Sequence, residues 1–315
     1  MITEDLIAKG GYMAMKNAVL AIPPDMYDAL RKEYRKERSP DARGAYERLF
    51  EHFDHQTELG KTICSDTGTI MYYVSIGSRA RLDPELSFWR ALGKVTVALT
   101  RESFVAPKSA DPIRRINNDL NVGENSPSLQ YKYVENLDYI EITAVAKGGG
   151  GEMSGSRFRM LLAADGLAGI KKFVIDSTVS SAMGGLTCPP VIVGVGVGGG
   201  LGIAGALAHE AAVLRPAGSR HPDRYIAELE EELLKAINRS GVGPYGLGGG
   251  CTALDVHVEF SNGHEGVVAT GVVAQCLMAH RATVRVHNNG AIEPAPYPVA
   301  WFTRPWLTYQ EAVTQ

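Results

Sequence analysis

Apolar residues in the first sixty positions recur mostly three or four residues apart, the spacing of one helix face. Three stretches follow this pattern, residues 3–22, 23–37 and 39–60, and the second and third carry proline close to their first turn. The third stretch ends at Gly60, and glycine commonly terminates helices. The sequence therefore predicts two or three helices over residues 1–60, packed against the section that follows.

Beyond these helices the pattern switches between strand and helix signals. Residues 69–77, TIMYYVSIG, are rich in β-branched and aromatic side chains, as strands are. Residues 139–151 and 252–290 alternate between apolar and polar positions, and the second segment predicts strands that pair with one another. Helices are expected at residues 84–105, 157–183 and 221–241, and a further strand at residues 191–198.

No internal repeat or low-complexity linker interrupts the chain, so we expect a single domain over residues 1–315. Its predicted fold class is α+β, with the N-terminal helices of residues 1–60 packed on mixed or antiparallel β-sheets that further helices surround. Residues 61–295 would form the core that carries the chemistry.

Composition narrows the choice of partners. Hydrophobic residues make up 45% of the 315 residues, enough for a stable core without disulfides. The net charge of −3 gives no general attraction to nucleic acid or to an anionic membrane. The N-terminus carries acids at positions 4 and 5, unlike a signal peptide, and no apolar stretch reaches the roughly 18 residues of a membrane span. We therefore expect a cytoplasmic protein that binds neither nucleic acid nor membrane.

Four cysteines, Cys64, Cys188, Cys251 and Cys276, lie far apart, so a disulfide framework is not expected. The separations of 124 residues between Cys64 and Cys188, and of 88 between Cys188 and Cys276, exclude the local spacing of zinc ribbons and ferredoxins. Any ligand set would have to be assembled by the fold. Thiolates favour zinc or iron–sulfur clusters, and three cysteines on a four-iron cluster would leave one iron open to substrate. Each cysteine could instead be a buried, inert thiol.

Glycines cluster at residues 148–151, 194–202 and 246–250, where the backbone must turn sharply or approach another group closely. Gly194, Gly196 and Gly199 form a G-x-G-x-x-G pattern between a predicted strand and a predicted helix, which invites a dinucleotide-binding interpretation. The run lies deep in the chain and we expect no full βαβ unit around it. We therefore favour close packing around a site.

Six separate motifs, spread over nearly the whole chain, occur together and in this order in one enzyme family. The chain resembles the class I, iron–sulfur-dependent family of fumarate hydratases and L(+)-tartrate dehydratases, specifically the α subunit or N-terminal domain. The motifs are KTICSDTGT, NVGENSP, AKGGGGEMS, TCPPVIVGVGVGG, GVGPYGLGGGCTALDVHVE and GVVAQCLMAHRA. Any one of them alone would be weak, but the set is specific.

The resemblance implies a cofactor. In the family, three cysteines in these motifs hold a [4Fe–4S] cluster whose fourth iron binds substrate, and by motif they match Cys64, Cys188 and Cys276. Cys251 falls in a glycine-rich turn where the family has no ligand, so we expect it to be a buried thiol.

The resemblance also implies substrate-binding residues. Asp66 matches an aspartate that contacts substrate and serves in acid–base chemistry, although it could equally cap its own loop. Arg101 matches an arginine that pairs with a substrate carboxylate, and the alternative is a surface arginine. Gly150 belongs to a loop whose backbone approaches the substrate. His264 matches a substrate-contacting histidine, with a solvated loop residue as the alternative.

Two departures from the family pattern affect the interpretation. Ser65 stands where the family typically has a substrate-contacting glutamine, and its shorter side chain could change which acid fits. The sequence carries no second, swivelling domain of the kind that supplies further carboxylate-binding and proton-transfer residues. We therefore expect a separate β subunit, and also a dimer of α subunits.

The predicted enzyme is a hydro-lyase that adds water to, or removes it from, a small dicarboxylic acid of the fumarate/malate or tartrate type. The open iron would polarise a hydroxyl and a carboxylate oxygen, while Arg101 and loop amides would hold the anion. The alternatives are an iron–sulfur electron carrier or redox sensor, and a non-catalytic subunit that retains the hydro-lyase fold. An electron carrier would gain nothing from an open iron or from carboxylate-binding residues.

Overall fold

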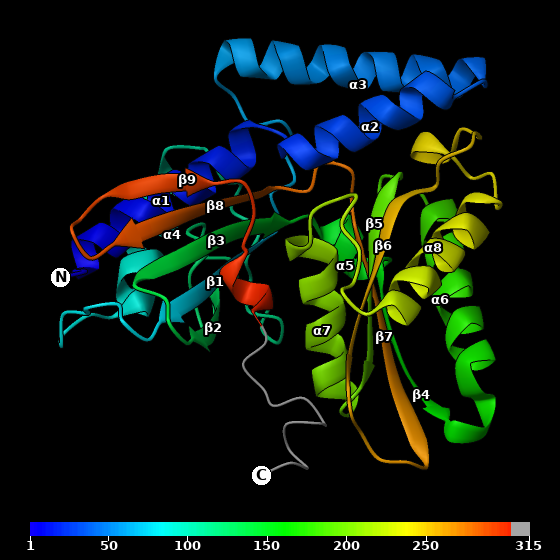
Figure 1. Ribbon diagram of the computed structural model, residues 1–315. Coiled ribbons are helices and arrows are strands. Elements are labelled where there is room, and N and C mark those ends of the chain that lie inside the picture. The colour runs from blue at the N-terminus through cyan, green and yellow to red at the C-terminus, as the bar shows by residue number, and fades with distance from the viewer. Residues whose placement is uncertain (304–315) are drawn as a thin grey trace.

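The computed structural model describes residues 1–303, which form two β-sheets and the helices that cover them (Figure 1). Elements are labelled in chain order: α1 (Glu4–Leu20), α2 (Pro24–Lys36), α3 (Pro40–Leu59), β1 (Thr69–Gly77), α4 (Phe88–Arg101), β2 (Ser128–Val134), β3 (Tyr139–Lys147), α5 (Gly149–Met153), β4 (Ser156–Leu162), η1 (Ala163–Asp165), α6 (Gly166–Met183), β5 (Val191–Gly198), α7 (Leu201–Leu214), α8 (Arg224–Asn238), η2 (Pro244–Gly246), β6 (Ala253–Ser261), β7 (Val267–Gln275), β8 (Arg281–His287), β9 (Ile292–Ala295) and η3 (Ala300–Phe302).

The first sheet has the strand order β2-β1-β3-β8-β9. Its β1–β2 pair is parallel and its other pairs are antiparallel. Because side chains alternate across a strand, β1 contributes to two cores. Ile70, Tyr72 and Val74 pack on the face covered by α1 and α4, whereas Met71 and Tyr73 point to the opposite face.

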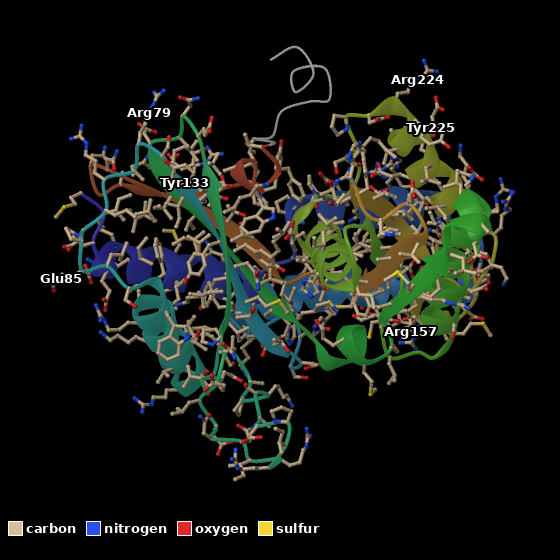
Figure 2. All side chains as sticks on the ribbon, turned by 90° about the horizontal axis from the view of Figure 1, so that it is seen from below. Arg79, Glu85, Tyr133, Arg157, Arg224 and Tyr225 are labelled. Carbon is tan, nitrogen blue, oxygen red and sulfur yellow. The ribbon has the colours of Figure 1, made fainter. Side chains whose placement is uncertain are left out.

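The second sheet has the strand order β4-β7-β5-β6, and only its β5–β6 pair is parallel. Helices α6 and α8 cover one face, and α7 packs on the other. Helix α7 also reaches the first sheet, since one apolar cluster joins Tyr73 and Val145 to Ala208 of α7 and Val273 of β7. Figure 2, seen from below, shows side chains filling the space between the two sheets.

Close packing explains the G-x-G-x-x-G run. A Cβ atom at Gly194 would lie 2.0 Å from the carbonyl oxygen of Ala208, and one at Gly196 would lie 2.0 Å from that of Ala204. Any side chain at these positions would therefore push α7 off β5. Contrary to our expectation, a β-α-α-β crossover does join the parallel strands β5 and β6. Its glycines allow α7 to pack closely on β5.

The α+β class and the N-terminal helices are confirmed, but two further local predictions are wrong. Residues 156–162 form strand β4, not the start of a helix over 157–183, because Phe158 and Met160 face one side of the strand and Leu161 the other. The strands within residues 252–290 form, yet they do not pair with one another: β6 and β7 flank β5, and β8 lies in the first sheet. Within residues 1–303, no helix is both long and apolar enough to span a membrane.

Candidate active site

Three cysteines lie in loops that connect the helices and sheets. Cys64 is in the segment between α3 and β1, and Cys188 is between α6 and β5. Cys276 directly follows β7, in the segment where the chain crosses from the second sheet to the first (Figure 1). All three are free thiols with partial exposure.

Contacts and charges show that these loops meet. The Leu277 backbone N–H donates to the Cys188 carbonyl oxygen at 3.3 Å. Burial raises the pKa of the Tyr245 hydroxyl, and the negative charges of the Cys188, Cys276 and Cys64 thiolates raise it further. Burial is the main cause that raises the pKa of the Cys188 thiol, and a negative charge on Cys64 raises it further. All three cysteines are therefore near enough to Tyr245 to affect its pKa. The fold thus places the loops that carry the three predicted ligands close to one another.

Cys251 lies in a different environment. It is only 2% exposed, and its thiol donates to the Ala253 carbonyl oxygen at 3.3 Å. Burial, rather than another cysteine, is the main cause that raises its pKa. These features are those of a buried structural thiol.

The three thiols are spread more widely than the ligands of a single ion. In the part of the chain that the structure describes, no three His, Cys, Asp or Glu side chains are grouped closely enough to hold one metal ion. In a four-iron cluster each thiolate binds a different iron, so the cluster itself separates its ligands.

A glycine loop, residues 148–151, links the cysteine-bearing segments. Asp66 Oδ2 accepts the Gly149 N–H at 2.9 Å, and the Asp66 N–H donates to Cys64 Sγ at 3.4 Å. A Cβ atom at Gly150 would lie 1.9 Å from the carbonyl oxygen of Leu186, two residues before Cys188. Asp66 thus binds a distant loop rather than its own, and Gly150 is required by close backbone approach.

Ser65 is exposed beside a cavity of about 270 Å³. This volume is near the lower end for small-molecule sites, roughly 300 Å³. Cys64 and Ser65 line this cavity together with residues that carry no charge. It is lined by Thr62, Cys64, Ser65, Thr67, Thr100, Ser103, Phe104, Val105, Ala106 and Pro107.

Arg101 does not line this cavity. It is the last residue of α4, is exposed, and lines a separate cavity of about 420 Å³ with Trp89 and Lys94. Successive helix residues point about 100° apart, so Thr100 faces the Cys64 cavity and Arg101 faces outward.

His264 is also remote from the cysteines within one chain. It is exposed in the turn between β6 and β7, and its Nδ1 accepts the Gly266 N–H at 3.0 Å. The nine residues of β7 separate this turn from Cys276, and such a strand is ~30 Å long. Figure 1 shows the turn and the β7–β8 segment at opposite ends of the second sheet.

A buried polar chain beside Cys276 was not found from the sequence. Lys147 is 1% exposed, and its Nζ lies 3.5 Å from Glu152 Oε1. Glu152 is 3.2 Å from His209 Nε2, and His209 Nδ1 is 2.8 Å from the Tyr73 hydroxyl. Burial raises the pKa of Glu152, but the hydrogen bond from His209 and the charge of Lys147 outweigh it and lower the pKa to about 2. The available signal was a lysine at the end of an apolar strand, next to the glycine loop.

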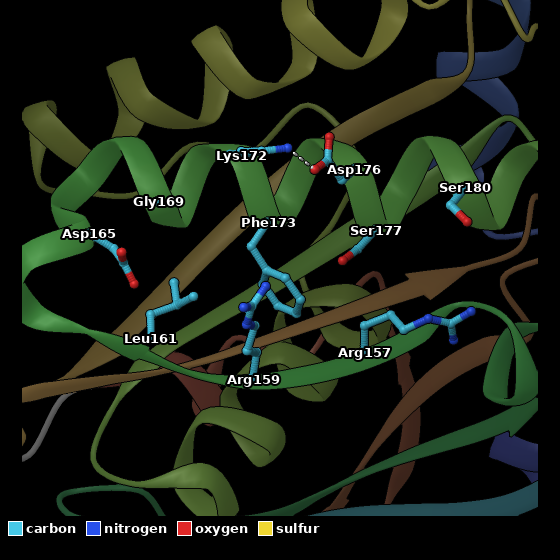
Figure 3. A pocket seen from close by; sticks show the side chains of 10 residues that line it. All are labelled: Arg157, Arg159, Leu161, Asp165, Gly169, Lys172, Phe173, Asp176, Ser177 and Ser180. Atoms are coloured by element: carbon cyan, nitrogen blue, oxygen red, sulfur yellow. Dashed lines mark hydrogen bonds and ion pairs between the residues drawn. The ribbon is translucent and has the colours of Figure 1, made fainter.

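A third cavity, of about 480 Å³, lies between β4 and α6 and is lined by none of the predicted site residues (Figure 3). Arg159 reaches from β4 toward Phe173 of α6, while Lys172 pairs with Asp176 along the helix. The lining of this cavity includes basic and acidic side chains but no cysteine or histidine, so it is separate from the cysteine site.

Comparison with known proteins identifies the family of the chain. The family model described as "Fumarate hydratase (Fumerase)" matches residues 11–285. A Methanocaldococcus jannaschii protein, named provisionally as the α subunit of L(+)-tartrate dehydratase, is 37% identical over 272 residues, 86% of this chain and 94% of that protein. The Escherichia coli UTI89 and K12 proteins named L(+)-tartrate dehydratase subunit alpha are 33% and 32% identical, each over 86% of this chain and 88% of their own. The resemblance seen in the sequence is confirmed, and the chain belongs to the class I fumarate hydratase family of hydro-lyases.

Proposed function

We propose that this chain is the α subunit of an iron–sulfur-dependent hydro-lyase that dehydrates L(+)-tartrate or a related hydroxy-dicarboxylic acid, together with a separate β subunit. The observation that carries the proposal is that backbone contacts join the three distant segments that carry Cys64, Cys188 and Cys276, through Leu277 and the glycine loop of residues 148–151. Family membership supports the reaction class, and the names of the relatives support the substrate and the subunit type.

The residues present fit a [4Fe–4S] cluster held by Cys64, Cys188 and Cys276. All three are free thiols, no fourth cysteine joins them, and the buried Lys147 Nζ beside them has no hydrogen-bond partner among residues 1–303. When bound, such a cluster supplies an open, Lewis-acidic iron that polarises a hydroxyl group and a carboxylate oxygen.

Asp66 is the proposed acid–base residue of this subunit. Its Oδ2 is engaged by the Gly149 N–H, which fixes the carboxylate and leaves Oδ1 free to exchange a proton with the departing or attacking water. The glycine loop keeps this orientation because Gly150 is locked against the Leu186 carbonyl. A group on the β subunit would take the proton from the carbon beside the substrate carboxylate.

Ser65 bears on the choice of substrate. It lines the cavity next to Cys64 and is shorter than the glutamine typical of the family. The space thus left suits an acid with an additional hydroxyl group, as in tartrate, better than fumarate or malate. Arg101 stays a prediction as a carboxylate-binding residue, since its side chain faces the other cavity.

A dimer of α subunits is part of the proposal. Because His264 and Cys276 lie at opposite ends of β7, His264 enters only as a residue of the second α subunit. If the assembled enzyme has the mass of one α and one β chain, there is no dimer of α subunits. His264 would then have no role in the site.

The proposed activity predicts turnover only in the complete, cluster-loaded protein. Purified α and β chains, reconstituted with iron and sulfide without oxygen, should convert L(+)-tartrate to a keto acid faster than they convert malate to fumarate. The control is the same protein after chelation of its iron, which should be inactive. Loaded α–β protein that dehydrates neither acid and does not hydrate fumarate would favour the non-catalytic subunit.

A further inference from the structure

Lys147 lies at the point where the glycine loop meets the strand that leads to Cys276. It is the last residue of β3, and it follows Val145 on the face that points toward the second sheet. A Cβ atom on Gly151 would be 3.0 Å from Lys147 Nζ and 3.3 Å from the carbonyl oxygen of Ala274, two residues before Cys276. The ammonium group is thus buried between the two sheets, beside the third cysteine.

The bonding capacity of this ammonium is only partly used, by an ion pair with Glu152. Lys147 Nζ carries three N–H donors, yet no hydrogen-bond acceptor contacts it among residues 1–303. The nearest carboxylate oxygen in an ion pair, Glu152 Oε1, is 3.5 Å away. A buried ammonium with open donors is costly, so an acceptor bound beside it would stabilise its charged form.

A chain of polar contacts holds Lys147 in place. Glu152 of α5 accepts from His209 Nε2, and His209 Nδ1 pairs with the Tyr73 hydroxyl of β1. Helix α7, which carries His209, packs on both sheets. The ammonium is therefore fixed relative to β1, β3 and α7 rather than resting on a mobile loop.

The group that the Lys147 ammonium would face on the cysteine side is negatively charged. With the cluster bound, the three cysteines would be thiolates, and the group they hold would carry net negative charge close to the glycine loop that Asp66 contacts. Cation charge and hydrogen bonds to sulfur raise the reduction potential of such a group. A buried lysine next to Cys276 supplies both.

We propose that Lys147 is a positioning residue for the cluster, with its ammonium donating to sulfur atoms at the Cys276 side and its place fixed by Glu152 and His209. This inference rests on the proposed cluster. It assigns no step of the hydration reaction to Lys147.

The test replaces Lys147 by methionine in the full chain, K147M, which keeps most of the length of the side chain and removes its charge. Iron loss to a chelator should become about 10–100-fold faster, the usual effect of removing an outer partner of metal ligands. The midpoint potential of the cluster, followed by EPR in an anaerobic titration, should move to more negative values. K147R, which restores the cation, should recover part of both properties.

Two further measurements separate this role from a merely structural one. Apo K147M loses the ion pair with Glu152 and should unfold at a lower temperature than the apo wild-type chain, so iron retention and potential are compared well below both unfolding temperatures. K171M removes Lys171 of α6, which pairs with Glu232 of α8 away from the cysteines, and should change neither iron retention nor potential. Unchanged iron retention and potential in loaded K147M would overturn the inference alone. A wild-type chain that never binds a cluster would overturn the proposed function as well.

Discussion

Replacing Cys276 by serine should leave the chain unable to retain a cluster and lower its hydro-lyase activity by on the order of 100-fold or more, since even outer partners of metal ligands cost 10–100-fold. Cys276 supplies one of three thiolates, and serine is a poor ligand for iron in such clusters. Iron and acid-labile sulfide per chain, measured after anaerobic reconstitution, give the readout, with turnover as a second.

Cys251 provides the matched control for this substitution. Its thiol donates to the Ala253 carbonyl oxygen, and a serine hydroxyl can keep that hydrogen bond in the same buried position. C251S should retain full iron content and activity within about two-fold, with a stability change of about 1 kcal/mol. Equal losses in C276S and C251S would contradict the assignment of ligands.

Changing Asp66 to asparagine should reduce kcat/KM by about 10²–10⁴-fold, the usual contribution of a general acid–base residue. Asparagine is nearly isosteric, and its amide oxygen can still accept the Gly149 N–H. The glycine loop should therefore stay in place while the carboxylate is lost.

The readouts for D66N are anaerobic steady-state kinetics and the iron content of the same sample. Normal iron with low kcat/KM identifies an acid–base role. Activity within a few-fold of wild type would remove Asp66 from the mechanism, and loss of iron would show that Asp66 supports the Cys64 loop rather than the chemistry.

Local signals predicted much of the fold. The β-branched run at residues 69–77 is strand β1, and Gly60 does end α3. The error over residues 157–183 arose because apolar residues lie on both faces of an edge strand: Phe158, Met160 and Leu162 are exposed, and Leu161 on the other face is buried. The apolar run therefore continues into α6 without a sequence signal for the boundary. Strand order depends on long-range pairing, which is why the partners of β6 and β8 could not be predicted.

For the candidate site too, residue type and motif could be read from the sequence, but position in the fold could not. Cysteines stand out by residue type and motif, and the fold brings the predicted three together. The positions of Arg101 and His264 depend on helix phase and on which end of the sheet a turn occupies, and a motif specifies neither. Lys147 was missed because its burial follows from the pairing of β3 with β1 and β8, not from its neighbours in the sequence.

The most direct test of the central claim is Mössbauer spectroscopy of ⁵⁷Fe-reconstituted protein, recorded without oxygen, with and without L(+)-tartrate. A cluster on three cysteines has one iron without a thiolate ligand, and the signal of that iron alone should shift when the diacid is added. A spectrum with four equivalent iron environments that ignores tartrate, malate and fumarate would contradict the account and favour an electron carrier.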